Sequence, residues 1–263
     1  MHEYIIAVII GVIEGVTEFL PISSTGHMIL AGAMLGFEGE VASAFQVFIQ
    51  LGAILAVLLL YREKFRQILS RDAFSQEKLG LLHLAAAIVP AAAAGFILHS
   101  PIKQYLFSPL TVIVGLIAGA VLMIAAERSA PRPQTTQLDA ISVKQAFYVG
   151  LFQLLSLWPG FSRSGSTIAG GMFLGVQRTA AAEFSFIVAV PLMFAACLYD
   201  LLKIWDKLSV ADLQLFAIGF VVAFGVAYLS IVWFLRFLNS STLTAFACYR
   251  IVIAAFAYAY FFL

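Results

Sequence analysis

The stretch EGVTEFLPISSTGH, residues 14–27, decides how the rest of this chain is interpreted. Glu14 and Glu18 are four residues apart, so on a helix both carboxylates lie on one face. Pro21 is expected to end that helix, because proline lacks a backbone N–H and clashes with the preceding turn. The stretch therefore predicts a helix, a break and a second helix, with two carboxylates just before the break.

The second helix begins at a cluster of hydroxyl groups. Ser23, Ser24 and Thr25 are candidate N-cap residues, and His27 follows about one turn later. A second polar island, PGFSRSGST at 159–167, also starts with a proline and a glycine, and it contains Arg163. Two breaks of the same kind therefore carry carboxylates and an imidazole in one case and a guanidinium in the other.

The remainder of the chain is almost entirely apolar. Of the 263 residues, 62% are hydrophobic and 11% are charged, with a mean hydropathy of +1.00, whereas a soluble domain is about 25% charged. The apolar segments are too continuous for the alternating strands of an outer-membrane barrel, so they indicate an all-α integral membrane protein. Because ionisable groups at membrane depth are costly, the two polar stretches are the candidate functional site.

Hydropathy divides the chain into helices in the order two short, three long, two short, three long. Each short pair predicts a re-entrant helix–loop–helix, because non-helical backbone at membrane depth is tolerated only inside protein or along a wet cavity. The predicted short helices cover 4–20, a segment ending near Gly36, 144–157 and a segment ending near Gly175; the six predicted spans cover 41–61, 79–98, 107–126, 180–203, 212–237 and 243–263.

This order predicts an internal repeat. Residues 35–64 laid on 174–203 without a gap are identical at seven of thirty positions. Each half crosses the membrane three times, an odd number, so the halves must be inverted. We therefore expect one membrane domain, 1–263, built from two inverted five-helix repeats at about 1–128 and 140–263. Paired broken helices in such a repeat place the binding site where they meet, near the midplane.

The distribution of Lys and Arg predicts the orientation, because basic residues are enriched on the cytoplasmic side. On one side the topology places three: Lys103, Lys203 and Lys207. On the other it places ten: Arg62, Lys64, Arg66, Arg71, Lys78, Arg128, Arg132, Lys144, Arg178 and Arg236. Both termini are thus expected outside, with the first hairpin entering from outside and the second from the cytoplasm.

The carboxylates of Glu14 and Glu18 predict a cation site or a catalytic base. Two carboxylates on one helical face repel unless a proton or a cation lies between them. A hard divalent cation that also binds phosphate oxygens, Mg²⁺ or Ca²⁺, suits such a pair. Alternatively one carboxylate acts as a general base, or the pair is only structural.

The hydroxyl cluster predicts a nucleophile. A hydroxyl beside an imidazole can attack an electrophile with that imidazole as its base, which makes Ser24, or else Thr25, the candidate nucleophile and His27 the candidate base. Ser23 and Thr25 are further candidates for binding substrate, although serines and threonines at such positions are commonly only helix caps.

The second island resembles an anion-binding nest. Glycines permit close backbone approach, and the N–H groups at a helix N-terminus attract phosphate. Arg163 adds a planar fork that matches phosphate oxygens. The predicted phosphate-binding residues are Ser162, Arg163, Ser164, Gly165, Ser166 and Thr167. Glu183 and Arg250, which also lie in or near spans, are interpreted as structural partners of intramembrane ions.

The two motifs resemble the signature segments of the bacterial undecaprenyl-diphosphate phosphatases of the bacitracin-resistance type, and the resemblance extends over essentially the whole chain. It implies release of inorganic phosphate from the polyprenyl diphosphate carrier of cell-wall synthesis, with catalytic roles for Glu14, Glu18, Ser24, His27 and Arg163. It also implies a homodimer in the bacterial inner membrane, with a site that faces the periplasm, a lipid substrate and no nucleic acid partner.

Two questions stay open at this level. Ser24 could form a phospho-enzyme, or a water activated by metal or glutamate could attack directly. The rival function is a polyprenyl-phosphate flippase or transporter, because inverted repeats with broken helices are typical of transporters. Release of phosphate from lipid diphosphate by the pure protein distinguishes the two functions.

Overall fold

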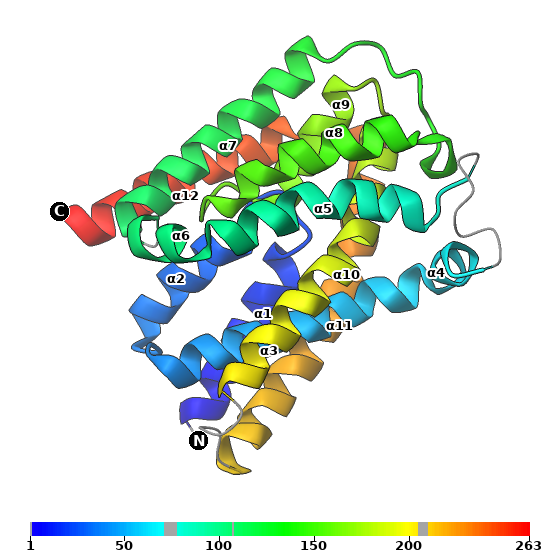
Figure 1. Cartoon of the computed structure of the whole chain (residues 1–263). Coiled ribbons are helices and arrows are strands. Elements are labelled where there is room, and N and C mark those ends of the chain that lie inside the picture. Colours follow the sequence, from blue (N-terminus) through cyan, green and yellow to red (C-terminus); the bar gives the residue numbers. More distant parts are fainter. Residues whose placement is uncertain (1, 71–77, 107, 205–209) are drawn as a thin grey trace.

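The computed structural model describes residues 2–70, 78–106, 108–204 and 210–263 (Figure 1). Arg71 and Lys207, two of the basic residues counted above, lie outside these ranges. Within them the regular structure is helical, apart from one isolated bridge between Thr135 and Val176. The helices are α1 (His2–Thr17), α2 (Ser24–Leu35), α3 (Glu40–Leu60), α4 (Arg62–Ile68), α5 (Leu81–Ile97), α6 (His99–Tyr105), α7 (Pro109–Ser129), η1 (Leu138–Ala140), α8 (Val143–Gln153), η2 (Leu154–Leu157), α9 (Arg163–Phe173), α10 (Arg178–Ile204), α11 (Val210–Ser240) and α12 (Thr244–Phe262).

Five helices of the described chain, α3, α7, α10, α11 and α12, are long and apolar enough to cross a membrane. The sixth predicted span, 79–98, contains α5, which has only 17 residues. At about 1.5 Å per residue it is shorter than the roughly 30 Å of a hydrocarbon core. The helix is shorter than predicted because it starts only after Gly80, whose N–H bonds the His83 ring, and because the helical path is interrupted at Leu98. Thus five of the six predicted spans meet the length criterion.

The two predicted breaks are both present, each between short helices. α1 ends at Thr17, three residues earlier than predicted, and the Thr17 hydroxyl donates to the Ile13 carbonyl at 2.7 Å. Residues 18–23 then form the tip of hairpin 1, which consists of α1 and α2. Hairpin 2 consists of α8, η2 and α9, with its tip at 158–162.

Both tips end in a serine with the same unusual backbone conformation. Among the described residues other than glycine, positive φ occurs at Ser23 (72°) and Ser162 (75°). Each serine caps the helix that follows: Ser23 Oγ accepts from the Gly26 N–H at 3.3 Å, and Ser162 Oγ accepts from the Gly165 N–H at 3.2 Å. A cap of this type satisfies an N–H that the first helical turn leaves free.

The hairpins are held among the long helices by close packing. α1 packs against α11 and α3, α8 packs against α5 and α9, and α7 packs against α12. A Cβ on Gly11 of α1 would lie 2.9 Å from the Gly219 carbonyl, and one on Gly52 of α3 would lie 2.4 Å from the Phe220 carbonyl. Small residues at these crossings let helices approach closely, as is usual in membrane proteins.

The outside of the bundle is apolar along the long helices, with exposed side chains such as Leu55, Ile117 and Leu229. α4 and the segment between α7 and α8 lie on the right of Figure 1, whereas the N-terminus is at the bottom and the C-terminus at the left. Long apolar helices with apolar outward-facing side chains indicate an integral membrane protein.

Candidate functional site

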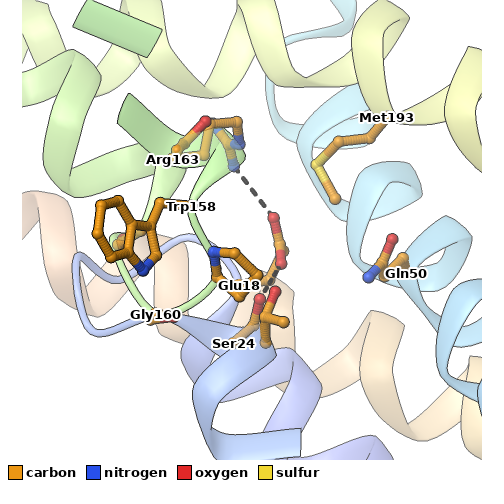
Figure 2. A pocket seen from close by; sticks show the side chains of 12 residues that line it. Glu18, Ser24, Gln50, Trp158, Gly160, Arg163 and Met193 are labelled. Atoms are coloured by element: carbon orange, nitrogen blue, oxygen red, sulfur yellow. Dashed lines mark hydrogen bonds and ion pairs between the residues drawn. The ribbon is translucent and has the colours of Figure 1, made fainter. Parts of the chain in front are cut away.

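The tips of both hairpins, together with α3 and α10, enclose a water-accessible cavity of about 170 Å³. The first turn of α9 contacts the tip of hairpin 1 directly, because the Ser164 hydroxyl donates to the Leu20 carbonyl at 2.9 Å. Figure 2 shows Glu18 between Arg163 and Ser24, with Gln50 and Met193 on the opposite wall and Trp158 to the side. The lining residues are Glu18, Ser23, Ser24, Thr25, Gln50, Ser156, Trp158, Pro159, Gly160, Ser162, Arg163 and Met193.

Glu18 is the centre of this arrangement. Its Oε2 accepts the hydrogen bond of Ser24 Oγ at 2.5 Å, and its Oε1 lies 3.2 Å from Arg163 Nη2. The three side chains come from the tip of hairpin 1 and the first residues of α2 and α9. A short hydrogen bond from hydroxyl to carboxylate, with the carboxylate oriented by a third group, is the arrangement of a nucleophile and its base.

The guanidinium of Arg163 is fixed on several sides. Nη1 donates to the carbonyl of Ser185 at 3.0 Å and to its hydroxyl at 3.2 Å, while Cζ lies 5.6 Å from the centre of the Phe19 ring. Its Nε is buried without a hydrogen-bond partner among the described residues. Arg163 thus keeps one N–H donor without a partner among the described residues.

Glu14 lies behind Glu18 and does not line the cavity. Its side chain is 0% exposed, and neither carboxylate oxygen has a hydrogen-bond partner among the described residues. A buried carboxylate without partners is very costly, and the neighbouring Glu18 adds repulsion. This position requires a proton or a cation.

His27 is held away from Ser24. Its Nδ1 lies 2.8 Å from the Ser23 carbonyl, and its Nε2 lies 2.8 Å from the Tyr249 hydroxyl. Because a carbonyl only accepts, Nδ1 carries the proton, and when the ring is neutral Nε2 accepts from Tyr249. The two rings stack in parallel with their centres 5.6 Å apart. Both ring nitrogens are therefore engaged, and neither bonds the Ser24 hydroxyl.

A comparison with known families identifies the family of this chain. The family model described as "Bacitracin resistance protein BacA" matches residues 7–256, nearly the whole chain and both hairpins. The chain belongs to this family. BacA proteins are undecaprenyl-diphosphate phosphatases, so the protein is a membrane hydrolase that recycles the cell-wall lipid carrier and confers bacitracin resistance.

In this BacA protein the predicted phosphate-binding residues divide into two groups. Ser23, Thr25, Ser162 and Arg163 line the cavity. The others lie in the buried interior of α9, where their hydroxyls bond to neighbouring groups: Ser164 to Leu20, Ser166 to the Ser162 carbonyl, and Thr167 to Ser185 Oγ, with Gly165 donating its N–H to Ser162. The second group therefore stabilises the start of α9 and the tip of hairpin 2 through buried hydrogen bonds.

Several lining residues were not predicted from sequence. Gln50 of α3 is a polar residue in a span, a signal that could have identified it; its Oε1 accepts from the Cys197 thiol at 3.4 Å. Trp158, whose indole N–H donates to the Thr111 carbonyl at 2.9 Å, and Met193 of α10 carry no distinctive signal. Ser185 does not line the cavity but bonds Arg163. Nothing in the sequence distinguishes it from other small residues of a packed helix.

The residues present fit a divalent cation only as an open site. No group of three or more His, Cys, Asp or Glu side chains that could hold a metal occurs among the described residues. Glu14 and Glu18 nevertheless offer carboxylate oxygens, those of Glu14 without partners. A hard cation could take the remaining ligands from phosphate and water, as Mg²⁺ commonly does.

Proposed function

We propose that undecaprenyl diphosphate is hydrolysed in the cavity between the two hairpin tips, with Ser24 as nucleophile and Glu18 as its base. The observation that supports this most directly is the 2.5 Å hydrogen bond from Ser24 Oγ to Glu18 Oε2. Ser24 is also the first residue of α2, where free backbone N–H groups favour an incoming phosphate. The geometry thus favours Glu18 over His27 for the role of base.

In this mechanism Ser24 Oγ forms a bond to the terminal phosphorus as its proton passes to Glu18. The bond between that phosphorus and the bridging oxygen breaks, and its electron pair leaves with undecaprenyl monophosphate, which takes the proton from Glu18. Water then attacks the phosphoserine, Glu18 accepts a proton from it and returns one to Ser24, and inorganic phosphate departs. Each step is general acid–base catalysis by one carboxylate.

Arg163 supplies positive charge to the transferring phosphate. Arg163 lines the cavity, and its Nη2, which now pairs with Glu18, is the donor proposed to turn to the phosphate. Charge on the phosphate oxygens in the transition state is stabilised by a donor that is already in position. Ser185 and Phe19 hold the guanidinium so that it does not need to reorganise.

Glu14 and Glu18 are also the proposed ligands of Mg²⁺ or Ca²⁺. When bound, such an ion would neutralise charge on the diphosphate. The unpartnered oxygens of Glu14 support the proposal, and a proton shared by the two carboxylates is the alternative.

His27 then has a positioning role. Its bond to the Ser23 carbonyl stabilises the strained turn just before Ser24, and Tyr249 of α12 fixes the ring from the other side. His27 acts on the nucleophile through the backbone in this proposal.

The architecture is proposed to be an inverted repeat of 1–128 and 140–263 with two re-entrant hairpins. Ser162 − Ser23 and Gly175 − Gly36 both give an offset of 139, and all four residues have positive φ. The same offset aligns 35–64 with 174–203. The first helix of each hairpin also packs on the second of the three predicted spans of the opposite half, α1 on α11 and α8 on α5.

We also propose an orientation in the membrane and a homodimeric assembly. Basic residues gather on the side of α4 and of the segment between α7 and α8, so that side is cytoplasmic and the termini are periplasmic. Hairpin 1 then enters from the periplasm of a bacterial inner membrane. The proposal of a homodimer rests on the family resemblance alone, and the mass of the detergent-solubilised protein by light scattering tests it.

Trapping of the phospho-enzyme tests the central step. Substrate labelled in the terminal phosphate, quenched within one turnover, should leave label on Ser24, and Ser24→Ala should lose both label and turnover. Thr25→Ala is the matched control, because it removes the neighbouring hydroxyl and should still form the phosphoserine. Substantial turnover by Ser24→Ala without any labelled protein would show direct attack by water.

A further inference from the structure

Arg250 is a buried cation that the mechanism above does not use. It lies in α12, its side chain is 0% exposed, and it does not line the cavity. Burying an arginine is costly unless its donors are satisfied. The hydrogen bonds that its guanidinium makes to the described residues all go to backbone carbonyls, so it is not the partner of an intramembrane acid that its sequence position suggested.

These carbonyls belong to three separate parts of the chain. Nη2 donates to Gly160 at 2.8 Å, in the tip of hairpin 2, and Nη1 donates to Pro21 at 3.4 Å, in the tip of hairpin 1. The remaining bonds go to α7, from Nη2 to Gly115 at 3.0 Å and from Nε to Leu116 at 3.1 Å. A single side chain therefore connects both tips to one rigid helix.

Two glycines of α7 leave the space that the Arg250 guanidinium and the tip of hairpin 2 occupy. A Cβ on Gly119 of α7 would lie 2.2 Å from Arg250 Nη2 and 2.5 Å from the Phe161 carbonyl. A Cβ on Gly115 would lie 2.4 Å from the Pro159 carbonyl. One glycine face of α7 thus accommodates both the tip of hairpin 2 and the arginine that bonds to it.

Only an arginine suits this position. Its planar fork carries five N–H donors in fixed directions, whereas a lysine ammonium is a single point with three. Without the fork, carbonyls of both tips would be buried without partners, at a cost that favours movement of the loops. Pro21 is three residues before Ser24 and Gly160 is three residues before Arg163, so movement of either loop reaches the reacting groups.

We propose that Arg250 is a positioning residue of the phosphatase: it holds the two hairpin tips in register, so that Ser24 and Arg163 face the same phosphate. It acts through the backbone at Pro21 and Gly160 without touching substrate. The proposal rests on the proposed function in placing the reaction at the tips.

The first experiment compares kcat and KM of Arg250→Lys and Gly119→Ala with undecaprenyl diphosphate as substrate. Displacement of the tips by about 1 Å costs on the order of 10²-fold in kcat. KM should change much less than kcat, because Arg250 does not touch substrate and binding of the prenyl chain does not depend on the tips. Gly225→Ala is the matched control: it makes the same change in a helix, at a position where nothing lies within 4 Å of the new Cβ, and it should keep the wild-type kcat.

The second experiment measures hydrogen–deuterium exchange of the tips independently of activity. In Arg250→Ala, exchange should rise in peptides covering 18–27 and 158–166 while α3 and α11 remain protected. Added guanidinium, at concentrations that do not denature the wild type, should restore both protection and turnover in Arg250→Ala but not in Gly119→Ala, where the space is filled.

The two experiments distinguish a positioning role of Arg250 from direct contact with substrate. Wild-type kcat in both Arg250→Lys and Gly119→Ala, or unchanged exchange at the tips, overturns the proposal, and so does a rise in KM alone, which would place Arg250 in contact with substrate. If Arg250→Ala does not fold, the two milder variants decide. If Ser24 proves not to be the nucleophile, the exchange result still stands, so failure of the mechanism is distinguishable from failure of this inference.

Discussion

The guanidinium of Arg163 is shared between Glu18 and Ser185. A diphosphate adds several negative charges to a site that already holds two carboxylates, and excess buried anion is costly in a low dielectric. Arg163→Lys keeps the charge but loses the fork. We predict a loss of at least about tenfold in turnover, or roughly 1.4 kcal/mol of barrier, measured as phosphate release in detergent.

The controls for Arg163 use folding and a distant arginine. Arg163→Ala should be nearly inactive yet still insert and elute like the wild type, because water can occupy the space that the side chain leaves. Arg236→Lys makes the conservative change at an exposed position of α11 and should keep full turnover. Near-normal turnover of Arg163→Ala would contradict the proposal that hairpin 2 binds the phosphate.

The carboxylate pair makes a prediction about metal removal. If Glu14 and Glu18 hold a divalent ion, rigorous chelation should abolish turnover and Mg²⁺ or Ca²⁺ should restore it. Glu14→Gln should weaken binding of Mn²⁺, followed by electron paramagnetic resonance, while Glu3→Gln, an exposed glutamate of the same helix, should not. Full turnover of the chelated enzyme would instead mean that the pair shares a proton.

At the scale of the secondary-structure element, the start of α9 depends on the backbone and side chain of one serine. Ser162 combines φ of 75° with an Oγ that accepts from the Gly165 N–H. Ser162→Ala keeps the strained φ and loses the cap, which typically costs about 1 kcal/mol, whereas glycine at a cap costs only a few tenths. A glycine also adopts positive φ without strain.

We therefore predict that Ser162→Gly unfolds at a higher temperature than Ser162→Ala, measured by thermal unfolding in detergent. Ser142 is the control, a cap with an ordinary φ of −78°. Because no positive φ has to be relieved there, the unfolding temperatures of Ser142→Gly and Ser142→Ala should differ less than those of the two Ser162 variants. An equal unfolding temperature of the two Ser162 variants would show that the backbone conformation there carries no strain.

At the scale of the whole molecule, the orientation predicts which loops are accessible. In a Cys248→Ser background, where Cys197 is buried, Ser70→Cys at the end of α4 should resist an impermeant maleimide in intact cells. Glu38→Cys, between α2 and α3, is the matched exposed position on the other side and should react. The reverse pattern would invert the assigned topology and the direction from which substrate enters.

Composition and local pattern were sufficient for several features. Long apolar runs predicted the helical membrane class because burial in lipid depends on residue type more than on partners. Pro21 and the 159–160 pair predicted the breaks because a proline or glycine acts on its own turn. The length of α5 was predicted less well, since its start and end depend on contacts such as the bond between Gly80 and His83.

The partners of the functional groups required the tertiary structure. Glu18 and Arg163 are 145 positions apart, and His27 and Tyr249 are 222 apart. The sequence placed His27 beside Ser24 because residues three apart lie on one face of a helix, but in the structure Ser24 bonds Glu18 while His27 bonds the Ser23 carbonyl and Tyr249. α12 packs on α7, and from there Tyr249 bonds His27 and Arg250 bonds both tips, while Glu18 is left to Ser24. Residue chemistry and local breaks were thus determined by the sequence itself, whereas the pairing of donors with acceptors was decided by long-range helix packing.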